Sequence, residues 1–280
     1  MVKKLFIFCA VSLVIPFVFH GRSWAEATNT SKIIPIFYLL LTDNSNKTVL
    51  DYPVILNDTG ITWGGNDYLS GNNVTCTSDI DAPQDCHQGR DVTHNDDSDG
   101  HAGFSYTKLD MNGNNLPASA TQWSCVRDNV TGLVWEVKTD DGGIHDKDNT
   151  YRWGGKTALG SDFGTYYSDW DSLVDGSNSE QLCGFSDWRV PTRQELQGLV
   201  NYGRINPSID TAYFPDIPYL PDAETSQFCF WSASPDVRGS VANVAWNVNF
   251  YSGEANGPIY RSVGYRVRLV RSGQRDGGGP

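Results

Sequence analysis

The chain has 280 residues, of which 39% are hydrophobic and 12% aromatic, and its formal net charge is −12. This acidic balance works against binding to nucleic acid or to an anionic membrane, so we expect neither as a partner. The aromatic content excludes a disordered chain, which would lack the apolar side chains needed for a core. The length accommodates one ordinary domain and a smaller segment.

Residues 1–25 are organised like a secretory signal peptide. Lys3 and Lys4 precede an apolar run at residues 5–19, and a small-x-small exit ends at Ala25. The apolar run is shorter than a retained membrane span requires. We therefore expect an exported mature chain, located in the periplasm, at the cell surface or outside the cell, with no stable membrane insertion.

Residues 26–120 are predicted to form an irregular, β-rich segment. Runs of strand length occur at residues 33–41 and 52–56, but residues 61–116 are dominated by Gly, Asn, Asp and Ser. Such a composition is typical of turns and short strands. The segment is therefore expected to bury little core of its own.

A partial calcium motif lies in this segment. Asn95, Asp97, Asp99 and Gly100 match the opening of an EF-hand-like loop, in which alternating oxygen ligands hold a hard cation. The twelfth position is Tyr106, where that loop requires a bidentate glutamate. Calcium is thus one interpretation, and a solvated acidic turn is the other. No other cofactor is expected.

The cysteines are consistent with an oxidising compartment. Cys76 and Cys86 are close enough in sequence to close a local loop, whereas Cys125 and Cys183 would tie the first strand of the next domain to the loop before its second helix. We prefer these two bridges, although sequence alone does not determine connectivity. Cys229 is then left over, and we expect it to be buried in a strand.

Residues 121–271 are predicted to form a domain with two short helices and a small antiparallel sheet. Residues 123–138 suggest two short strands around a turn, and residues 168–174 a first helix. Three further strands are expected, at residues 229–232, 244–251 and 264–270. In the last of them, Val267 and Leu269 are expected to face inward and Arg266 and Arg268 outward. The Gly-rich tail, residues 272–280, is expected to be disordered.

The second helix is the most clearly specified element. Thr192 and Glu195 form a capping box, which predicts a start at Arg193, and Gly203 is the expected left-handed stop. Its inward face is predicted to consist of the apolar residues Leu196, Leu199 and Val200.

An acid, an indole and a base stand in front of this helix as Asp187, Trp188 and Arg189. We expect a buried indole held between an acid and a base that pair with each other. A buried ion pair of this kind usually specifies geometry rather than catalysis.

Several of these segments resemble the bacterial Lcl C-terminal domain family. The matching runs are DWRVPTRQELQGLV (187–200), DNVTGLVWE (128–136), NPSIDTAYFP (206–215), FWSASP (230–235), AWNVNFYSG (245–253) and YRVRLVR (265–271). The resemblance extends over residues 123–271 and, more distantly, to the C-type-lectin-like and formylglycine-generating-enzyme superfamily. It implies an α+β, C-type-lectin-like domain with a small twisted sheet. Formylglycine-generating enzymes use a reactive cysteine pair near the end of the fold, and residues 241–271 contain no cysteine.

Motifs of catalysis are missing from the sequence. There is no G-x-S-x-G elbow and no H-E-x-x-H zinc motif. We therefore predict a non-enzymatic binding or adhesion module of a bacterial envelope, with a glycan or a surface protein as partner. One alternative is a structural subunit of a surface appendage or secreted assembly. Another is an enzyme on the formylglycine-generating-enzyme-like scaffold.

The residues expected to bind a ligand lie near the last strands, where aromatic faces, amides and guanidinium groups occur together. They are Trp246, Asn247, Asn249, Tyr251, Arg261, Arg266 and Arg268. For the tryptophans of this domain, a role in the core is the alternative. The resembled family is associated with adhesion and with sulfated glycosaminoglycans. Residues 121–280 contain 14 basic and 20 acidic side chains, which disfavours a polyanion. A local arginine stripe would still suit a single sulfate; its members are Arg261, Arg266, Arg268, Arg271 and Arg275.

Overall fold

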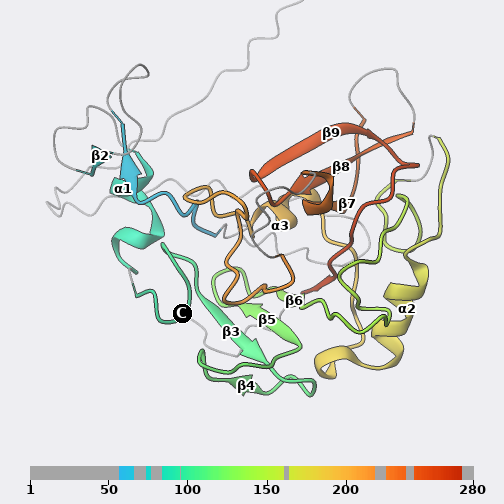
Figure 1. Cartoon of the computed structure of the whole chain (residues 1–280), viewed down its shortest axis with the longest axis horizontal. Helices are drawn as coiled ribbons and strands as arrows, with labels where there is room; N and C mark the ends of the chain where they lie inside the picture. Colours follow the sequence, from blue (N-terminus) through green and yellow to red (C-terminus); the bar gives the residue numbers. More distant parts are fainter. Residues whose placement is uncertain are drawn as a thin grey trace, which may run out of the picture. The chain divides into compact units, whose positions relative to one another are not determined.

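The structure is a computed structural model that describes residues 57–65, 74–76, 84–94, 96–160, 164–217, 225–237 and 243–272 (Figure 1). The expected signal peptide, the strands expected at 33–41 and 52–56, Asn95 and residues 273–280 of the tail lie outside this part of the chain. Within it, no helix combines the length and apolar character required to cross a bilayer.

The larger sheet has five antiparallel strands in the order β10-β6-β5-β3-β4. Their bounds are β3 Tyr106–Leu109, β4 Asn115–Leu116, β5 Cys125–Asp128, β6 Val134–Glu136 and β10 Val270–Arg271. β5 and β6 are the two strands predicted around the turn, which Asp128 stabilises by accepting hydrogen bonds from the Val130 and Thr131 amides at 2.9 and 3.1 Å.

Strands β3 and β4 of this sheet come from the segment expected to be irregular. Every residue of β3 pairs with β5, from Tyr106 opposite Asp128 to Leu109 opposite Cys125. The expected boundary at residue 120 therefore lies within one sheet. Before it, the structure also contains a two-stranded sheet, β1 Trp63–Gly64 and β2 Val74–Thr75, and the short helix α1 Asp85–Gln88.

The second sheet is a three-stranded antiparallel meander. It consists of β7 Cys229–Pro235, β8 Val244–Asn249 and β9 Glu254–Tyr260. β9 was not predicted, because its sequence EANGPIY has little alternation and contains Pro258. Proline removes a backbone donor, and β9 tolerates this because it lies at the edge of the sheet. In place of the strand expected at 264–270, the structure has β10, Val270–Arg271, which shares only Val270 with that range.

The two predicted helices exist with different limits. α2 is Asp171–Ser179, later and longer than the expected 168–174, and α3 is Arg193–Gln197, which packs against β7 and β8 (Figure 1). The predicted capping box is present, with Glu195 N donating to Thr192 Oγ1 at 3.2 Å and Thr192 N donating to Glu195 Oε2 at 2.8 Å.

The predicted end of α3 at Gly203 is wrong. The helix closes at Gly198, and Asn201 N donates instead to the Ser208 carbonyl at 2.9 Å. Gly203 does not adopt the left-handed conformation. A Cβ at this position would collide with the carbonyl oxygen of Gly60, so close backbone approach explains the glycine.

Both preferred disulfides are formed. The Cα atoms of Cys76 and Cys86 are 5.8 Å apart, and those of Cys125 and Cys183 are 6.5 Å apart. Cys229 is buried in β7, outside these bridges, as expected.

Trp188 is buried as predicted, with 1% of its surface exposed, and its indole N–H donates to the Leu182 carbonyl at 3.0 Å. It belongs to a core cluster that also contains both halves of one disulfide and the buried tryptophans Trp153, Trp170 and Trp231. A second cluster lies around α3 and includes the three residues predicted for its inward face, Leu196, Leu199 and Val200, although the last two follow the end of the helix.

The expected ion pair between Asp187 and Arg189 is wrong. Arg189 forms a two-bond pair with Glu195, at 2.6 and 2.8 Å, and Asp187 accepts from Arg271 Nε at 2.7 Å. The reason is an antiparallel bridge between Arg189 and Val270, which brings the next residue of β10 beside Asp187. The capping glutamate therefore also anchors the segment that carries the indole.

Candidate functional site

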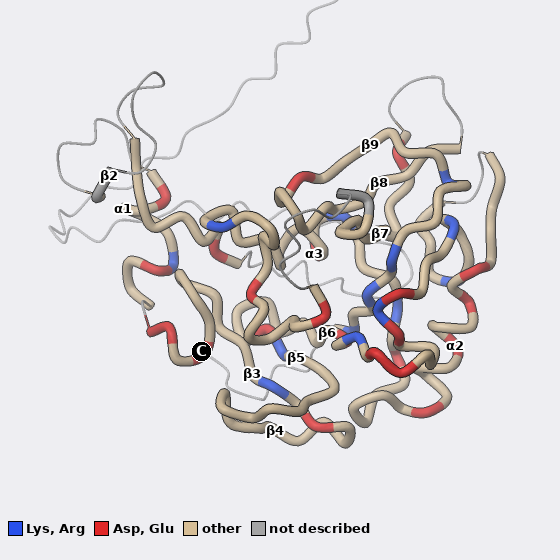
Figure 2. The backbone as a smooth tube through the Cα atoms, viewed as in Figure 1, with Lys and Arg blue, Asp and Glu red and all other residues tan. Residues whose placement is uncertain are grey.

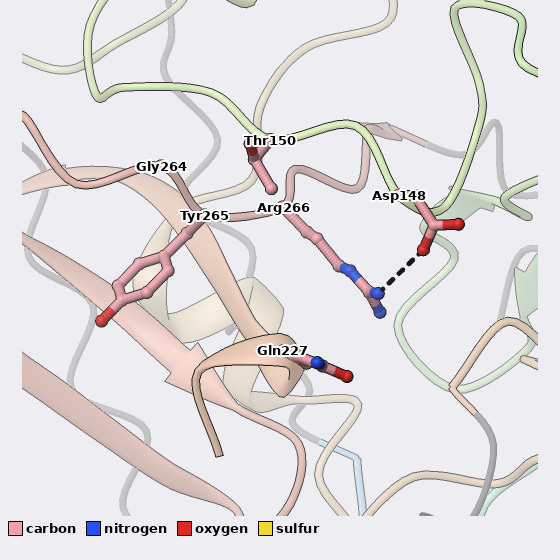
Figure 3. A pocket seen from close by; sticks show the side chains of 6 residues that line it. All are labelled: Asp148, Thr150, Gln227, Gly264, Tyr265 and Arg266. Atoms are coloured by element: carbon pink, nitrogen blue, oxygen red, sulfur yellow. Dashed lines mark hydrogen bonds and ion pairs between the residues drawn. The ribbon is translucent and has the colours of Figure 1, made fainter. Parts of the chain in front are cut away.

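A polar hollow of about 290 Å³ is the candidate binding site. It is lined by Asp148, Thr150, Gln227, Gly264, Tyr265 and Arg266 (Figure 3). These residues come from three segments: the acidic loop after β6, the 3-10 turn before β7, and the extended chain that leads to β10.

Backbone pairing positions two neighbouring residues that line the hollow. Tyr265 pairs with Tyr151 through reciprocal hydrogen bonds of 2.8 and 3.1 Å. Arg266 is held by β7, because its amide donates to the Cys229 carbonyl at 3.1 Å and its carbonyl accepts from Trp231 N at 2.8 Å. The hollow is thus built on paired backbone rather than on a loose loop.

Arg266 is the charged centre of the hollow. Its guanidinium Nη2 lies 3.3 Å from Asp148 Oδ1, and the two side chains are 15% and 65% exposed. Burial lowers the pKa of Arg266, while Asp148 opposes that shift. Asp148 also contacts the Lys147 ammonium at 3.0 Å, so its carboxylate is shared between Lys147 and Arg266. Arginine remains a cation throughout the physiological range and offers five N–H donors.

A second polar hollow, of about 350 Å³, shares Thr150 with the first. Its lining is Gly142, Gly143, Ile144, Asn149, Thr150, Tyr151 and Ser172. Burial, followed by the charge of Glu136, raises the pKa of Tyr151 to about 12. This phenol is therefore a neutral hydrogen-bonding group at physiological pH, and no activated nucleophile results from it.

The predicted arginine stripe does not form a surface. Arg268 is fully buried and pairs with the equally buried Asp216. Arg261 is also buried and lies 4.2 Å over the ring of Trp153. Arg271 pairs with Asp187, and Arg275 lies outside the described residues. Among the four described members of the stripe, Arg266 is the one that lines the hollow. Figure 2 shows basic residues interleaved with acidic ones between β6 and α2, which agrees with paired rather than clustered charge.

The other predicted ligand residues lie outside both hollows. Trp246 lies under the guanidinium of Arg193, at 4.4 Å. Asn247 is fully buried and donates to the β9 backbone at 3.1 Å, and Asn249 accepts from the Tyr251 amide at 2.8 Å. These amides stabilise the turn and the pairing of β8, so they do not form a ligand surface with Arg266.

In the partial calcium motif, Asp97 and Asp99 each have a local hydrogen-bond partner. Asp97 Oδ1 accepts from the Ala102 amide at 3.1 Å, and Asp99 Oδ2 accepts from Ser105 Oγ at 2.6 Å. These contacts fit the acidic-turn interpretation of that loop.

A closer acidic group lies in the loop after β6. Carboxylate oxygens of Asp140, Asp146 and Asp148 lie within 4.8 Å of one another. The Lys147 ammonium contacts two of them, at 2.9 and 3.0 Å, and Asp146 accepts three backbone N–H groups. Lys147 and backbone N–H groups thus provide hydrogen-bond partners for all three carboxylates.

A buried carboxylate that was not predicted supports the loop beside both hollows. Glu136 is fully buried, and its oxygens accept from Lys138 Nζ at 2.9 Å, from the Leu269 amide at 2.8 Å and contact His145 Nδ1 at 2.7 Å. Burial opposes its ionisation, but Lys138 and His145 hold the pKa of Glu136 down at about 2. The sequence signal that could have predicted this buried carboxylate is a glutamate at the end of an apolar strand, in LVWE.

Acid should destabilise the protein through Glu136. Its folded pKa is about 2, below the ordinary 4.5, so its stabilisation is complete above about pH 4.5 and is lost as the pH falls toward 2. We expect about 3 kcal/mol of unfolding free energy to depend on this ionisation. Urea titrations from pH 6 to 2 measure it. Glu136→Gln should reduce the decrease in unfolding free energy at low pH. Glu254→Gln, at an exposed position of β9, should show the same decrease as wild type.

Comparison with known proteins assigns the family. The family model of the Lcl C-terminal domain matches residues 124–271, from the residue before β5 to the end of β10. No curated protein and no solved structure matches the chain. The match covers more than half of the sequence. It includes α3, the segment around Trp188 and Arg266 of the hollow. The chain belongs to the Lcl C-terminal domain family.

Proposed function

We propose that this chain is an exported, non-enzymatic binding or adhesion module that recognises a glycan in the hollow at Arg266. The hollow combines a guanidinium, a threonine hydroxyl and an exposed amide, whereas the ring of Tyr265 points away from Arg266 (Figure 3). Sugars present hydroxyl groups that pair with such donors and acceptors, and a small number of well-placed polar groups is typical of ligand sites. This donor set is the observation that supports the proposal.

The lining of the hollow favours binding over hydrolysis. Asp148 is the one carboxylate that lines it among the described residues, and it is already paired with Arg266 and Lys147. A glycosidase ordinarily requires two carboxylates flanking the scissile bond. The second hollow continues the polar surface beyond Thr150, so the ligand we propose is a chain of sugars rather than a single one.

The location and finer fold class are part of this proposal. Two disulfides are typical of proteins that fold outside the cytosol, which supports export to the periplasm or beyond. A C-type-lectin-like arrangement is supported by two helices, antiparallel sheets and a bridge from β5 to the loop before α3. Neither requires a cofactor.

A glycan array with wild-type protein and two matched variants tests the proposal. We expect Arg266→Gln to weaken binding by about tenfold or more, because hydrogen bonds from a charged donor are lost. Arg127→Gln removes a guanidinium from β5, where it contacts Asn115 at 2.9 Å outside the hollow, and should bind like wild type. Melting curves confirm that both variants fold. Absence of binding at micromolar protein, or equal binding by Arg266→Gln, would contradict the proposal.

A further inference from the structure

His145 lies between two carboxylates in the loop that lines both hollows. Its Nδ1 is 2.7 Å from Glu136 Oε1, and its Nε2 makes a short contact with Glu180 Oε1. Glu136 belongs to β6 in the core, whereas Glu180 caps the C-terminal end of α2. The ring therefore connects the loop to two separate elements.

The geometry determines the charge of this ring. A carboxylate only accepts hydrogen bonds, so a ring nitrogen beside each carboxylate must carry a proton. A neutral imidazole has one N–H, whereas imidazolium has two. With both carboxylates ionised, contacts at both ring nitrogens are therefore satisfied only by the imidazolium form of His145.

We propose that His145 is a proton-operated clamp that holds the loop at residues 139–149 against β6 and α2 and so sets the shape of both hollows. When the imidazolium loses a proton to solvent, one ring nitrogen presents a lone pair to a carboxylate, and that contact becomes repulsive. Glu180, 47% exposed, is the partner that can turn to water, while Glu136 is fully enclosed. Release should therefore begin at the α2 side.

The loop also packs directly against α2. Ile144 lies over Gly176, where a Cβ on the helix would meet its Cδ1 at 2.5 Å, and this contact needs the loop in place. Within the loop, Thr139 N donates to the His145 carbonyl and Lys147 N donates to the Thr139 carbonyl, both at 2.9 Å. These two amides report whether the loop is closed.

The direction of the pH effect follows from the surroundings of the ring. Burial alone would lower the pKa of His145, but the hydrogen bonds and charge of Glu136 and the contact with Glu180 raise it above 6.5. The clamp is thus complete below about pH 6.5 and opens as the pH rises through the higher folded value. The charged and titratable groups around it are Glu136 and Tyr151, Lys138, Glu180, Asp141 and Asp146. Carboxylic acids, amines and phenols ordinarily titrate well outside this window.

The first experiment follows the ring and the loop in the ligand-free full chain. Nitrogen NMR of the imidazole gives its protonation state, and amide exchange of Thr139 and Lys147, corrected for intrinsic rates, gives loop closure. We expect protection to fall by about fivefold to tenfold as His145 deprotonates, because one hydrogen bond between charged groups is lost near the surface. Unchanged protection across the His145 titration would overturn the proposal.

Two carboxylate-to-amide variants separate the clamp from general charge effects. Glu180→Gln should lower the pH at which His145 titrates and remove the pH dependence of loop protection. The amide oxygen can accept from the protonated ring, and the amide N–H can donate to the neutral one. Glu254→Gln removes an exposed carboxylate from β9 and should behave like wild type. Wild-type behaviour of Glu180→Gln, or equal changes in both variants, would overturn the clamp.

A consequence for ligand binding rests on the proposed function. If the array identifies a glycan, its affinity should fall with loop protection as the pH rises. The exchange measurement needs no ligand, so failure of glycan binding and failure of the clamp are distinguishable. A clamp that operates in a protein without glycan affinity would disprove only the function.

Discussion

Trp188→Ala is expected to lower the free energy of unfolding by about 3 to 5 kcal/mol, the usual cost of emptying a buried tryptophan site. The indole has 1% of its surface exposed and lies in the core cluster that contains Trp153 and Trp170. Its N–H also donates to the Leu182 carbonyl, so the variant would leave a cavity and a carbonyl without that donor. Urea unfolding followed by circular dichroism measures the loss.

Two other substitutions calibrate this result. Trp188→Phe retains most of the apolar volume and loses the hydrogen bond, so it should cost less than the alanine variant. Tyr260→Ala removes an aromatic ring that is 62% exposed and should change stability by about 0.5 kcal/mol or less. If Trp188→Ala costs no more than Tyr260→Ala, the indole does not organise the core.

Replacing Cys125 and Cys183 together by alanine is expected to cost about 4 kcal/mol. The bridge spans 58 residues of sequence, and breaking it enlarges the unfolded ensemble by the freedom of that loop. It also joins β5 to the chain before α3, and both cysteines are fully buried. Chemical denaturation of the purified variant, with free thiols counted, measures the cost.

The second bridge provides the comparison. Cys76 and Cys86 are 10 residues apart, so their double alanine variant should lose about 3 kcal/mol. The short loop should therefore cost less than the long one. A larger loss from the short bridge would show that packing, rather than chain entropy, determines the effect of these disulfides.

Local patterns predicted the features that neighbouring residues determine. Thr192 and Glu195 are three positions apart, and their capping box forms as expected. Trp188 is buried, and the two preferred cysteine pairs are the ones that form. The capping box depends on a short spacing, the burial of Trp188 on the size of its side chain, and the two bridges on the positions of the cysteines along the sequence.

Partners across the fold were not predictable in the same way. Arg189 pairs with Glu195 and Asp187 with Arg271, because the register of β10 decides which charges meet. Arg268 lies in the core although alternation placed it outside, since Asp216 arrives from a distant segment. A charged residue in an apolar alternation does not reveal whether it has a buried partner.

The candidate site was predicted only through Arg266. Thr150 and Gln227 line the hollow, but neither has a sequence pattern that distinguishes it from other polar loop residues. His145 has no recognisable motif around it, since Glu136 and Glu180 are 9 and 35 positions away from it. Sites assembled from three segments require the tertiary register before they become visible.

The pairing of β3 with β5 bears on how this family can be studied in isolation. The family match begins one residue before β5, yet in this chain the hydrogen-bonding edge of β5 is covered by a strand from upstream. A fragment limited to residues 124–271 would expose a row of vacant amide and carbonyl groups along β5. Such edges recruit strands from other molecules, so the fragment would be prone to self-association that the longer chain avoids.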